Sequence, residues 1–188
     1  MRRKKLTKFQ LRYDPADIPK LAAEYMATPY EGGTAADKER KMEDAGQRIA
    51  GGDFSRRNLE IVCEWKSKRR IGLLTENTDA EIKQALKRAR ATSAADVKGA
   101  VSSLTGLAGV GVKMASAILT AIFPERYTVF DFRALEALGV ENTENVDAYA
   151  LYLEACRSMA KQYGVKLRDF DRANWQWSKN KSKRVRCC

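Results

Sequence analysis

Hydrophobic residues recur three and four positions apart along most of the chain, which is the spacing of one face of an α-helix. Five stretches show this pattern, at 82–89, 97–104, 115–122, 146–163 and 167–177. An earlier apolar stripe of Ile18, Leu21, Ala22 and Tyr25 predicts a packing helix near the N-terminus. Strand-like alternation is nearly absent, and Tyr127–Phe130 is the only short β-leaning stretch. We therefore expect an all-α protein of about eight or nine helices.

Polar residues and glycines mark where several of these helices begin and end. Helix starts are expected after Thr78, after Ser93 in a capping-box-like pair with Asp96, and at Thr143–Glu144. Helix ends are expected at Gly51–Gly52 and Gly139. Segment 28–35, rich in turn-forming residues, is interpreted as a loop.

The charge is concentrated at the two ends of the chain. The 188 residues carry a net charge of +11, from 35 basic and 24 acidic side chains. Residues 1–10 and 179–188 each hold five basic and no acidic residues, so the charges of 11–178 nearly balance. We interpret the ends as basic flexible tails that strengthen binding to a polyanion. The alternative is that they only improve solubility.

Absent residues and motifs exclude several classes of protein. The chain has no histidine, which excludes His-based catalytic triads and His-ligated zinc sites. Its four cysteines form no C-x-x-C pair, so we expect no zinc and no iron–sulfur cluster. The longest uncharged run, 99–112, is too short for a membrane span, and no secretory signal is expected. These features predict a cytoplasmic protein, nucleoid-associated if the source is bacterial.

The segment Leu107–Ala115 reads Leu-Ala-Gly-Val-Gly-Val-Lys-Met-Ala and lies between two amphipathic stretches. Gly109 and Gly111 keep side chains out of the turn, and Val110 lies between them. The N–H groups that open the following helix can then hold a DNA phosphate, aided by the helix dipole. A bound monovalent cation at this hairpin is a further expectation.

This segment resembles the helix-hairpin-helix motif of the base-excision DNA glycosylases related to endonuclease III and the oxoguanine glycosylases. Asp131 lies 18 residues after Lys113, which is the spacing of the lysine-bearing branch of that superfamily. The resemblance covers about 36 residues strongly. It implies one compact unit over 1–188, a two-lobed helical bundle with a cleft between the lobes, the hairpin at 94–123, and a monomer. The cysteine cluster common in the family is missing here.

The resemblance also implies a reaction. Lys113 would attack C1′ of a flipped-out nucleotide, and Asp131 would activate it and stabilise the positive charge on the sugar. The product, a Schiff base, would lead to β-elimination, so we expect a bifunctional glycosylase and lyase. The alternatives are that Lys113 only contacts a phosphate and that Asp131 only caps a helix.

Further residues are assigned to DNA and to the base pocket by position. Lys66, Ser67, Lys68 and Arg69 lie about where the family contacts the flipped-out gap, and Arg133 follows the aspartate where the family places a Thr-His pair. Trp65 and Trp175 are candidates for the base pocket, and the alternative is that they pack in the core or, for Trp175, on the second lobe. Asp169 and Asp171, acids in a basic chain, are either salt-bridged or functional, and we favour the structural interpretation.

Four hypotheses remain open for the function. The partner is double-stranded DNA with a damaged, mismatched or modified base. The enzyme removes that base with strand scission, removes it without scission, or acts on a hypermodified base of foreign DNA, such as phage DNA, in defence. The fourth hypothesis is a non-catalytic helix-hairpin-helix module that binds DNA through phosphates and does not need Asp131.

Overall fold

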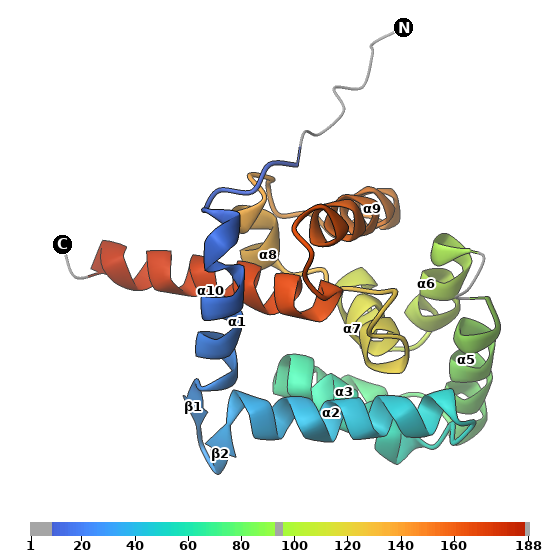
Figure 1. The fold of residues 1–188 in the computed structure, drawn as a ribbon. Coiled ribbons are helices and arrows are strands. Elements are labelled where there is room, and N and C mark those ends of the chain that lie inside the picture. Colours follow the sequence, from blue (N-terminus) through green and yellow to red (C-terminus); the bar gives the residue numbers. More distant parts are fainter. Residues whose placement is uncertain (1–8, 93–95, 187–188) are drawn as a thin grey trace, which may run out of the picture.

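The computed structural model describes residues 9–92 and 96–186, and it confirms the expected all-α class (Figure 1). The first helices are α1 (Ile18–Met26), α2 (Ala35–Ala50), α3 (Arg56–Ser67), α4 (Ile71–Leu74) and α5 (Asp79–Thr92). The later ones are α6 (Val97–Thr105), α7 (Val112–Ile122), α8 (Phe132–Ala137), α9 (Val146–Gln162) and α10 (Leu167–Arg186). Two 3-10 turns, η1 (Pro15–Asp17) and η2 (Lys68–Arg70), precede α1 and α4. Within the described ranges, no helix is long and apolar enough to cross a bilayer.

The strand-forming tendency of residues 127–130 does not produce a strand. The backbone groups of this segment bond to side chains instead: the hydroxyls of Tyr149 and Tyr152 donate to the carbonyls of Thr128 and Val129 at 3.2 and 3.1 Å. The Phe130 N–H donates to the hydroxyl of Ser116 at 2.8 Å. Because these partners satisfy the backbone, the segment needs no neighbouring strand.

The described strand pair occurs in the segment that was expected to be a loop. β1 (Pro29–Tyr30) and β2 (Gly33–Thr34) pair antiparallel across a tight turn. Thr34 then caps α2 in a capping box with Asp37. This small hairpin fixes the chain between α1 and α2.

Most of the predicted helix boundaries agree with the structure. Thr78 and Glu81 form a reciprocal cap at the start of α5, Gly51–Gly52 follow α2, and Gly139 follows α8. The start of α6 is corrected from Ser93 to Asp96, which is itself the N-cap and accepts the Gly99 N–H at 2.9 Å; Ser93 lies outside the described residues. The start of α9 is corrected from Thr143 to Asn145, whose side chain accepts from two N–H groups of the first turn.

The C-terminal segment is helical, which corrects the expected flexible tail at 179–188 for its described part. α10 runs to Arg186, and its later side chains bond to other helices. Lys181 pairs with Glu136 of α8 at 2.9 Å, and Asn180 donates to Glu24 of α1 at 3.0 Å. Residues 1–8 and 187–188 of the two expected tails lie outside the described residues.

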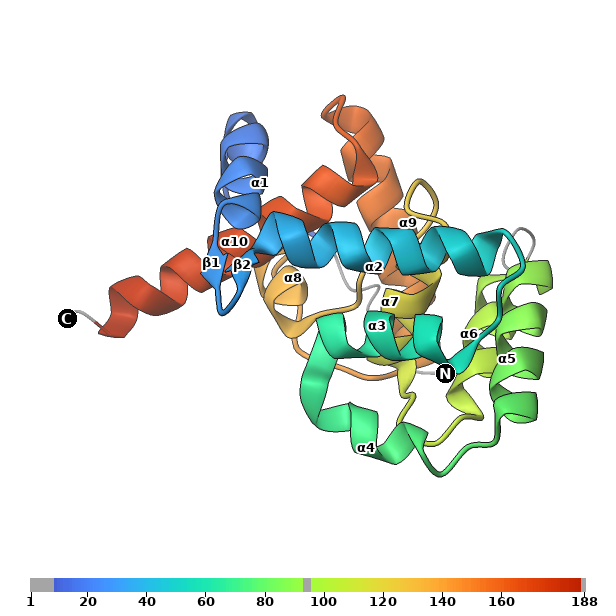
Figure 2. The same cartoon turned by 90° about the horizontal axis from the view of Figure 1, so that it is seen from below.

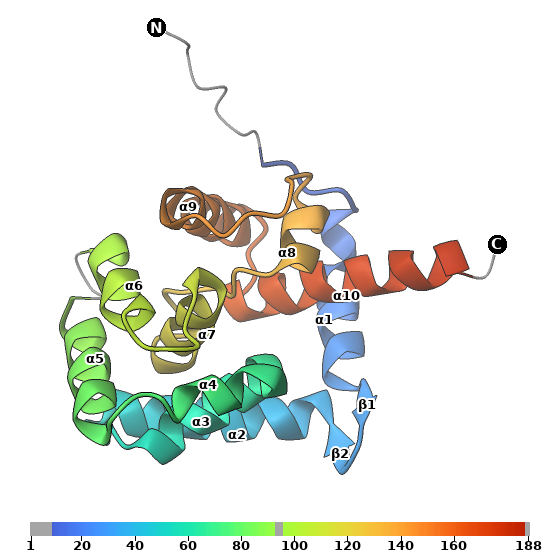
Figure 3. The ribbon, with the colours of Figure 1, turned by 180° about the vertical axis from the view of Figure 1, so that it is seen from behind.

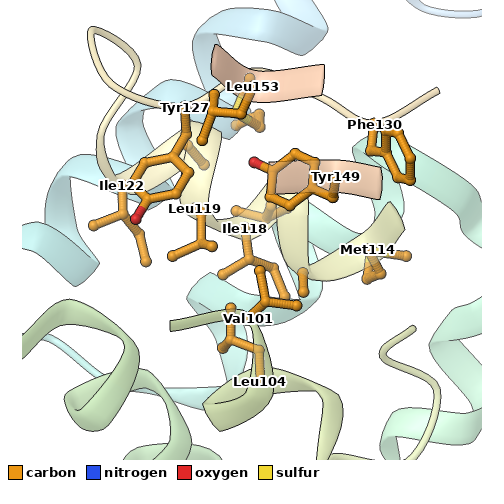
Figure 4. Close-up of a cluster of buried hydrophobic side chains, with 14 of the residues drawn as sticks. Val101, Leu104, Met114, Ile118, Leu119, Ile122, Tyr127, Phe130, Tyr149 and Leu153 are labelled. Carbon is orange, nitrogen blue, oxygen red and sulfur yellow. The ribbon is translucent and has the colours of Figure 1, made fainter. Parts of the chain in front are cut away.

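α7 is the central helix of the fold and is buried from Met114 to Ile122. It packs on α2, α3 and α6, and its close approach to α2 depends on Gly46 (Figure 2). A Cβ atom at Gly46 would lie 2.0 Å from the carbonyl oxygen of Ala121, so only glycine fits there. Figure 4 shows the aliphatic side chains of α6 and α7 packed against Tyr127, Phe130 and Tyr149.

α10 organises the other part of the molecule by crossing α1 and packing on α8 and α9 (Figure 3). The Leu167 and Phe170 stripe predicted for α10 is buried, as is the stripe of Ile18, Leu21, Ala22 and Tyr25 on α1. Trp177 stacks on Tyr13, with ring centroids 5.8 Å apart, and packs against the core as expected. The segment that leads from α7 to Asp131 connects the helices around α7 to those around α10.

Candidate functional site

A pocket lies where α1, α2, α3, α10 and the start of α8 meet. Its volume is about 200 Å³. Because pockets for drug-sized ligands run from about 300 to 1,000 Å³, this one suits a single small group. The lining residues that matter for chemistry are Tyr25, Trp65, Lys66, Asp131, Asp171 and Trp175. These residues lie far apart in sequence, and only the fold brings them together.

Asp131 holds an ionised carboxylate in this pocket. It is the N-cap of α8, where its Oδ1 accepts the N–H of Arg133 at 3.0 Å. Its Oδ2 accepts a hydrogen bond from the ammonium of Lys66. Burial raises the pKa of Asp131, but the Lys66 charge and these hydrogen bonds outweigh burial, and the pKa lies below its ordinary value. The capping role of the sequence-based alternative is therefore present, together with a charge directed to a pocket.

The lysine that meets Asp131 is Lys66, and Lys113 lies elsewhere. Lys66 belongs to the last turn of α3 and was expected to contact phosphate; its side chain is 14% exposed and lines the pocket. Lys113, in the first turn of α7, donates to Asn142 at 2.6 Å and pairs with Glu144 at 3.3 Å. It is not among the residues that line this pocket. Sequence spacing identified Asp131 but gave no signal for its partner, which is 65 residues away.

Trp65 and Trp175, the two tryptophans expected at a base pocket, both line the pocket described here. The guanidinium of Arg168 lies 5.4 Å from the ring centre of Trp65. Trp175 meets Tyr25 edge-on, with ring centroids 5.3 Å apart, and has the guanidinium of Arg133 5.4 Å from its ring. These contacts hold the two indoles in place, and cation–π contacts of this kind stabilise such an arrangement. Flat rings fixed around a small pocket can stack on a flat ligand.

Beneath the pocket lies a network of buried charges. Glu39 of α2 is fully buried and accepts two hydrogen bonds from Arg168, at 2.6 and 2.7 Å. Arg172 donates to it at 2.8 Å, and the Tyr25 hydroxyl donates at 2.9 Å. Burial raises the pKa of Glu39, but the two guanidinium groups overcome it and hold the pKa below its ordinary value. The sequence gave no indication of Glu39, because a lone acid on an amphipathic helix usually faces solvent.

The two acids of α10 are salt-bridged, as the sequence analysis predicted. Asp169 pairs with Arg172 at 3.1 Å, and Asp171 pairs with Arg168. Asp171 lines the pocket, and its burial raises its pKa to about 6 although Arg168 opposes the shift. The pocket therefore contains one carboxyl group with a lowered pKa, Asp131, and one with a raised pKa, Asp171.

The glycine hairpin between α6 and α7 is fastened to the end of α4. Gly109 has a φ of +81°, and a Cβ atom there would lie 2.9 Å from Leu73. Asn77 bonds both the N–H and the carbonyl of Ala108, at 2.8 and 3.2 Å. Gly111 is exposed at the N-cap of α7, whereas the side chain of Val110 is buried, so Val110 offers only its backbone to a ligand. The sequence analysis did not single out Asn77.

The basic residues that follow α3 lie beside this hairpin. Ser67 ends α3, and Lys68, Arg69 and Arg70 form the exposed turn η2, whose last carbonyl is close to Gly109. The glycine hairpin and the basic residues after α3, which are far apart in the sequence, thus share one surface. The guanidinium of Arg133 lies over the exposed ring of Phe132, and its Nη1 donates to Ser178 and Ser182 at 3.4 and 3.3 Å.

In the described part of the chain, no group of three or more Cys, Asp or Glu side chains is placed to hold a metal ion. Comparison of the chain with protein-family models, with curated proteins and with solved structures finds no match. The pocket, the hairpin and the residues between them are therefore the features that point to a function.

Proposed function

We propose that the protein is a DNA N-glycosylase that takes a flipped-out base into the pocket and breaks the bond between that base and its sugar. One observation supports this most directly: a partly buried, ionised Asp131 is paired with a lysine in a small pocket that two tryptophans also line. Each part of that arrangement matches one requirement of the reaction.

The Asp131 carboxylate has the negative charge that would stabilise the positive charge developing on the sugar. Breaking an N-glycosidic bond makes the sugar cationic, and a fixed negative charge nearby stabilises that state. Asp131 remains ionised because its pKa is lowered, and its attachment to α8 fixes its position. A buried charge is more effective than one in water because fewer solvent molecules screen it.

The pocket matches the base. A base removed from the stack loses its neighbours, and aromatic side chains replace them by stacking. Trp65 and Trp175 supply those surfaces, and the volume of about 200 Å³ admits one small planar group. Whether that base is oxidised, mismatched or hypermodified depends on polar contacts inside the pocket, so the substrate class is part of the test.

The surface next to the pocket matches the DNA backbone. The chain leaves the pocket at Lys66 and continues into the exposed basic turn Lys68–Arg70, which contacts the hairpin at Gly109. Basic side chains and the N–H groups at a helix start both bind phosphates without reading sequence. We propose that this surface holds the strand while the base enters the pocket, in a protein with two lobes around that cleft.

A lysine in the site extends the reaction to strand scission. An amine that attacks C1′ gives a Schiff base, and β-elimination then cuts the strand. The resemblance assigns this amine to Lys113.

A non-catalytic hairpin module would need the surface at Lys68–Arg70 and Gly109. Such a module would not require an ion pair in a pocket lined by aromatic side chains.

The test is base excision from a panel of duplexes that carry oxidised, mismatched or hypermodified bases. Wild-type protein, Asp131→Asn and the exposed control Glu125→Gln are compared for excision and for DNA binding. We expect Asp131→Asn to bind DNA normally but to excise about 100–1,000-fold more slowly, the usual cost of losing one preorganised charge-stabilising group. Equal excision by Asp131→Asn and wild type, or no excision of any base by the wild type, would contradict the proposal.

A further inference from the structure

We propose that Lys66, and not Lys113, is the amine that attacks C1′ of the flipped nucleotide. This inference rests on the proposed function and assigns the nucleophile within the same pocket. It departs from the motif resemblance, which implies Lys113, and is carried by where the two ammonium groups lie.

Lys66 is positioned as a nucleophile would be. Its Nζ bonds directly to Oδ2 of Asp131, and both side chains line the pocket, with exposed fractions of 14% and 16%. A nucleophile and the group that activates it are normally within hydrogen-bond distance of each other. Any sugar carbon that lies against Asp131 inside the pocket is therefore also near the Lys66 amine.

Lys113 is positioned differently. Its Nζ is held by Asn142 and Glu144, in the segment that leads into α9. Both oxygens of Asp131 already accept hydrogen bonds, one from Lys66 and one from the Arg133 N–H. For Lys113 to act, its ammonium would have to leave both Asn142 and Glu144.

The reaction begins at the ammonium of Lys66. It gives up one proton, and its lone pair forms a bond to C1′ while the bond from C1′ to the base breaks. The base leaves with the bonding electron pair and takes up that proton, while Asp131 stays ionised beside the cationic sugar. The sugar ring then opens at the bond between C1′ and O4′, O4′ takes a proton from Nζ, and an iminium forms between C1′ and Nζ. Loss of a proton from C2′ breaks the bond between C3′ and its phosphate oxygen and cuts the strand.

The experiment is borohydride trapping on duplex DNA with an abasic site. There the amine condenses with the C1′ aldehyde, water leaves, and hydride reduces the imine to a stable secondary amine. The proteins compared are the wild type, Lys66→Gln, Lys66→Arg and Lys113→Gln. Each is first checked for folding by thermal melting and for DNA binding. Lys66→Arg is the decisive variant, because it keeps the positive charge beside Asp131 but cannot form the imine.

We expect the wild type and Lys113→Gln to form the adduct and both Lys66 variants to lose it. Peptide mapping of the wild-type adduct by mass spectrometry is expected to place the DNA on Lys66. An adduct on Lys113, or one that survives in Lys66→Arg and disappears in Lys113→Gln, would overturn the inference. If the wild type excises bases through Asp131 but forms no adduct, the inference fails while the proposed function stands. If it neither excises nor traps, the proposed function itself fails.

Discussion

Two sets of charges lie at the same pocket, the network around Glu39 beneath it and the pair of Lys66 and Asp131 in its lining, and they differ in how firmly each is held. In the network around Glu39, that carboxylate accepts hydrogen bonds from Arg168, Arg172 and Tyr25. The other set is the pair of Lys66 and Asp131. Among the described contacts, the Lys66 ammonium has one hydrogen-bond partner, the carboxylate of Asp131. A charge with several buried partners has a fixed geometry, and removing one partner leaves the rest uncompensated.

The number of buried partners distinguishes charges that hold the structure together from charges that can react. The Glu39 network connects α2 to α10 and so joins the helices on two sides of the pocket. The pair of Lys66 and Asp131 lies at the end of one helix and the start of another, where one partner can be exchanged for a substrate. The predictions below test this distinction, from the largest expected effect on stability to the smallest.

Replacing Glu39 with Ala is expected to destabilise the fold by about 3–5 kcal/mol, because Arg168 and Arg172 would lose the fully buried carboxylate that they share. Urea denaturation of the variant and the wild type measures this. Glu43→Ala is the matched control: it also removes a partner of Arg172, but its side chain is 42% exposed, so we expect less than about 1 kcal/mol. A similar, small loss for both variants would show that the network is not structural.

Asp171 is expected to make stability depend on pH. Its pKa is raised from 3.8 to about 6 by burial, although Arg168 and Lys66 oppose the shift; Glu39 and Asp131 add to it. The native state therefore holds a proton that the unfolded state has released between pH 4 and 6, and the stability from this group is present below pH 4 and lost as the pH rises through 6.

Asp171→Asn removes that dependence. Relative to this variant, the wild type is expected to lose on the order of 2–3 kcal/mol between pH 4 and 7. Denaturation curves of both proteins across this range provide the measurement. A difference that stays constant with pH, or that grows in favour of the wild type as the pH rises, would show that Asp171 is ionised throughout.

Replacing Asp131 is expected to affect stability much less than replacing Glu39. Asparagine can still accept the Arg133 N–H and cap α8, whereas alanine cannot, so Asp131→Ala should cost about 1 kcal/mol more than Asp131→Asn. Lys66, on the last turn of α3, can extend its ammonium towards water when its partner is removed. Thermal melting of both variants tests this, and a loss as large as that of Glu39→Ala would place Asp131 among the structural charges.

The exposed cations should affect DNA binding without affecting stability. Replacing Lys68, Arg69 and Arg70 together with Gln is expected to change the free energy of unfolding by less than about 0.5 kcal/mol. It should also lower the slope of log affinity against log salt by about 0.9 for each phosphate that the variant no longer neutralises. The matched control replaces the exposed Lys83, Lys87 and Arg88 of α5 with Gln. Equal changes of slope in the two triple variants would show that the basic turn η2 does not bind the DNA backbone specifically.

The sequence predicted the local structure well because helices are determined by neighbouring residues. Apolar spacing located α1, α5, α6, α7, α9 and α10, and the cap predicted at Thr78 lies at a true helix start, whereas Asp96, expected inside the first turn after Ser93, is itself the cap of α6. The same reasoning overestimated the β tendency of Tyr127–Phe130, whose backbone partners come from distant side chains. It also missed the extent of α10, since a run of basic residues gives no sign of the Glu24 and Glu136 that meet it.

The sequence by itself determined that this is a helical protein with a glycine hairpin, an aspartate that opens a short helix, and tryptophans on two of its helices. Only the tertiary structure decided that Asp131 meets Lys66, that Lys113 lies with Asn142 and Glu144, and that Glu39 is buried under the pocket. The physical reason is the distance along the sequence over which each kind of interaction acts. Periodicity and capping act over a few residues, whereas these ion pairs join helices whose relative positions follow from the packing of the whole core.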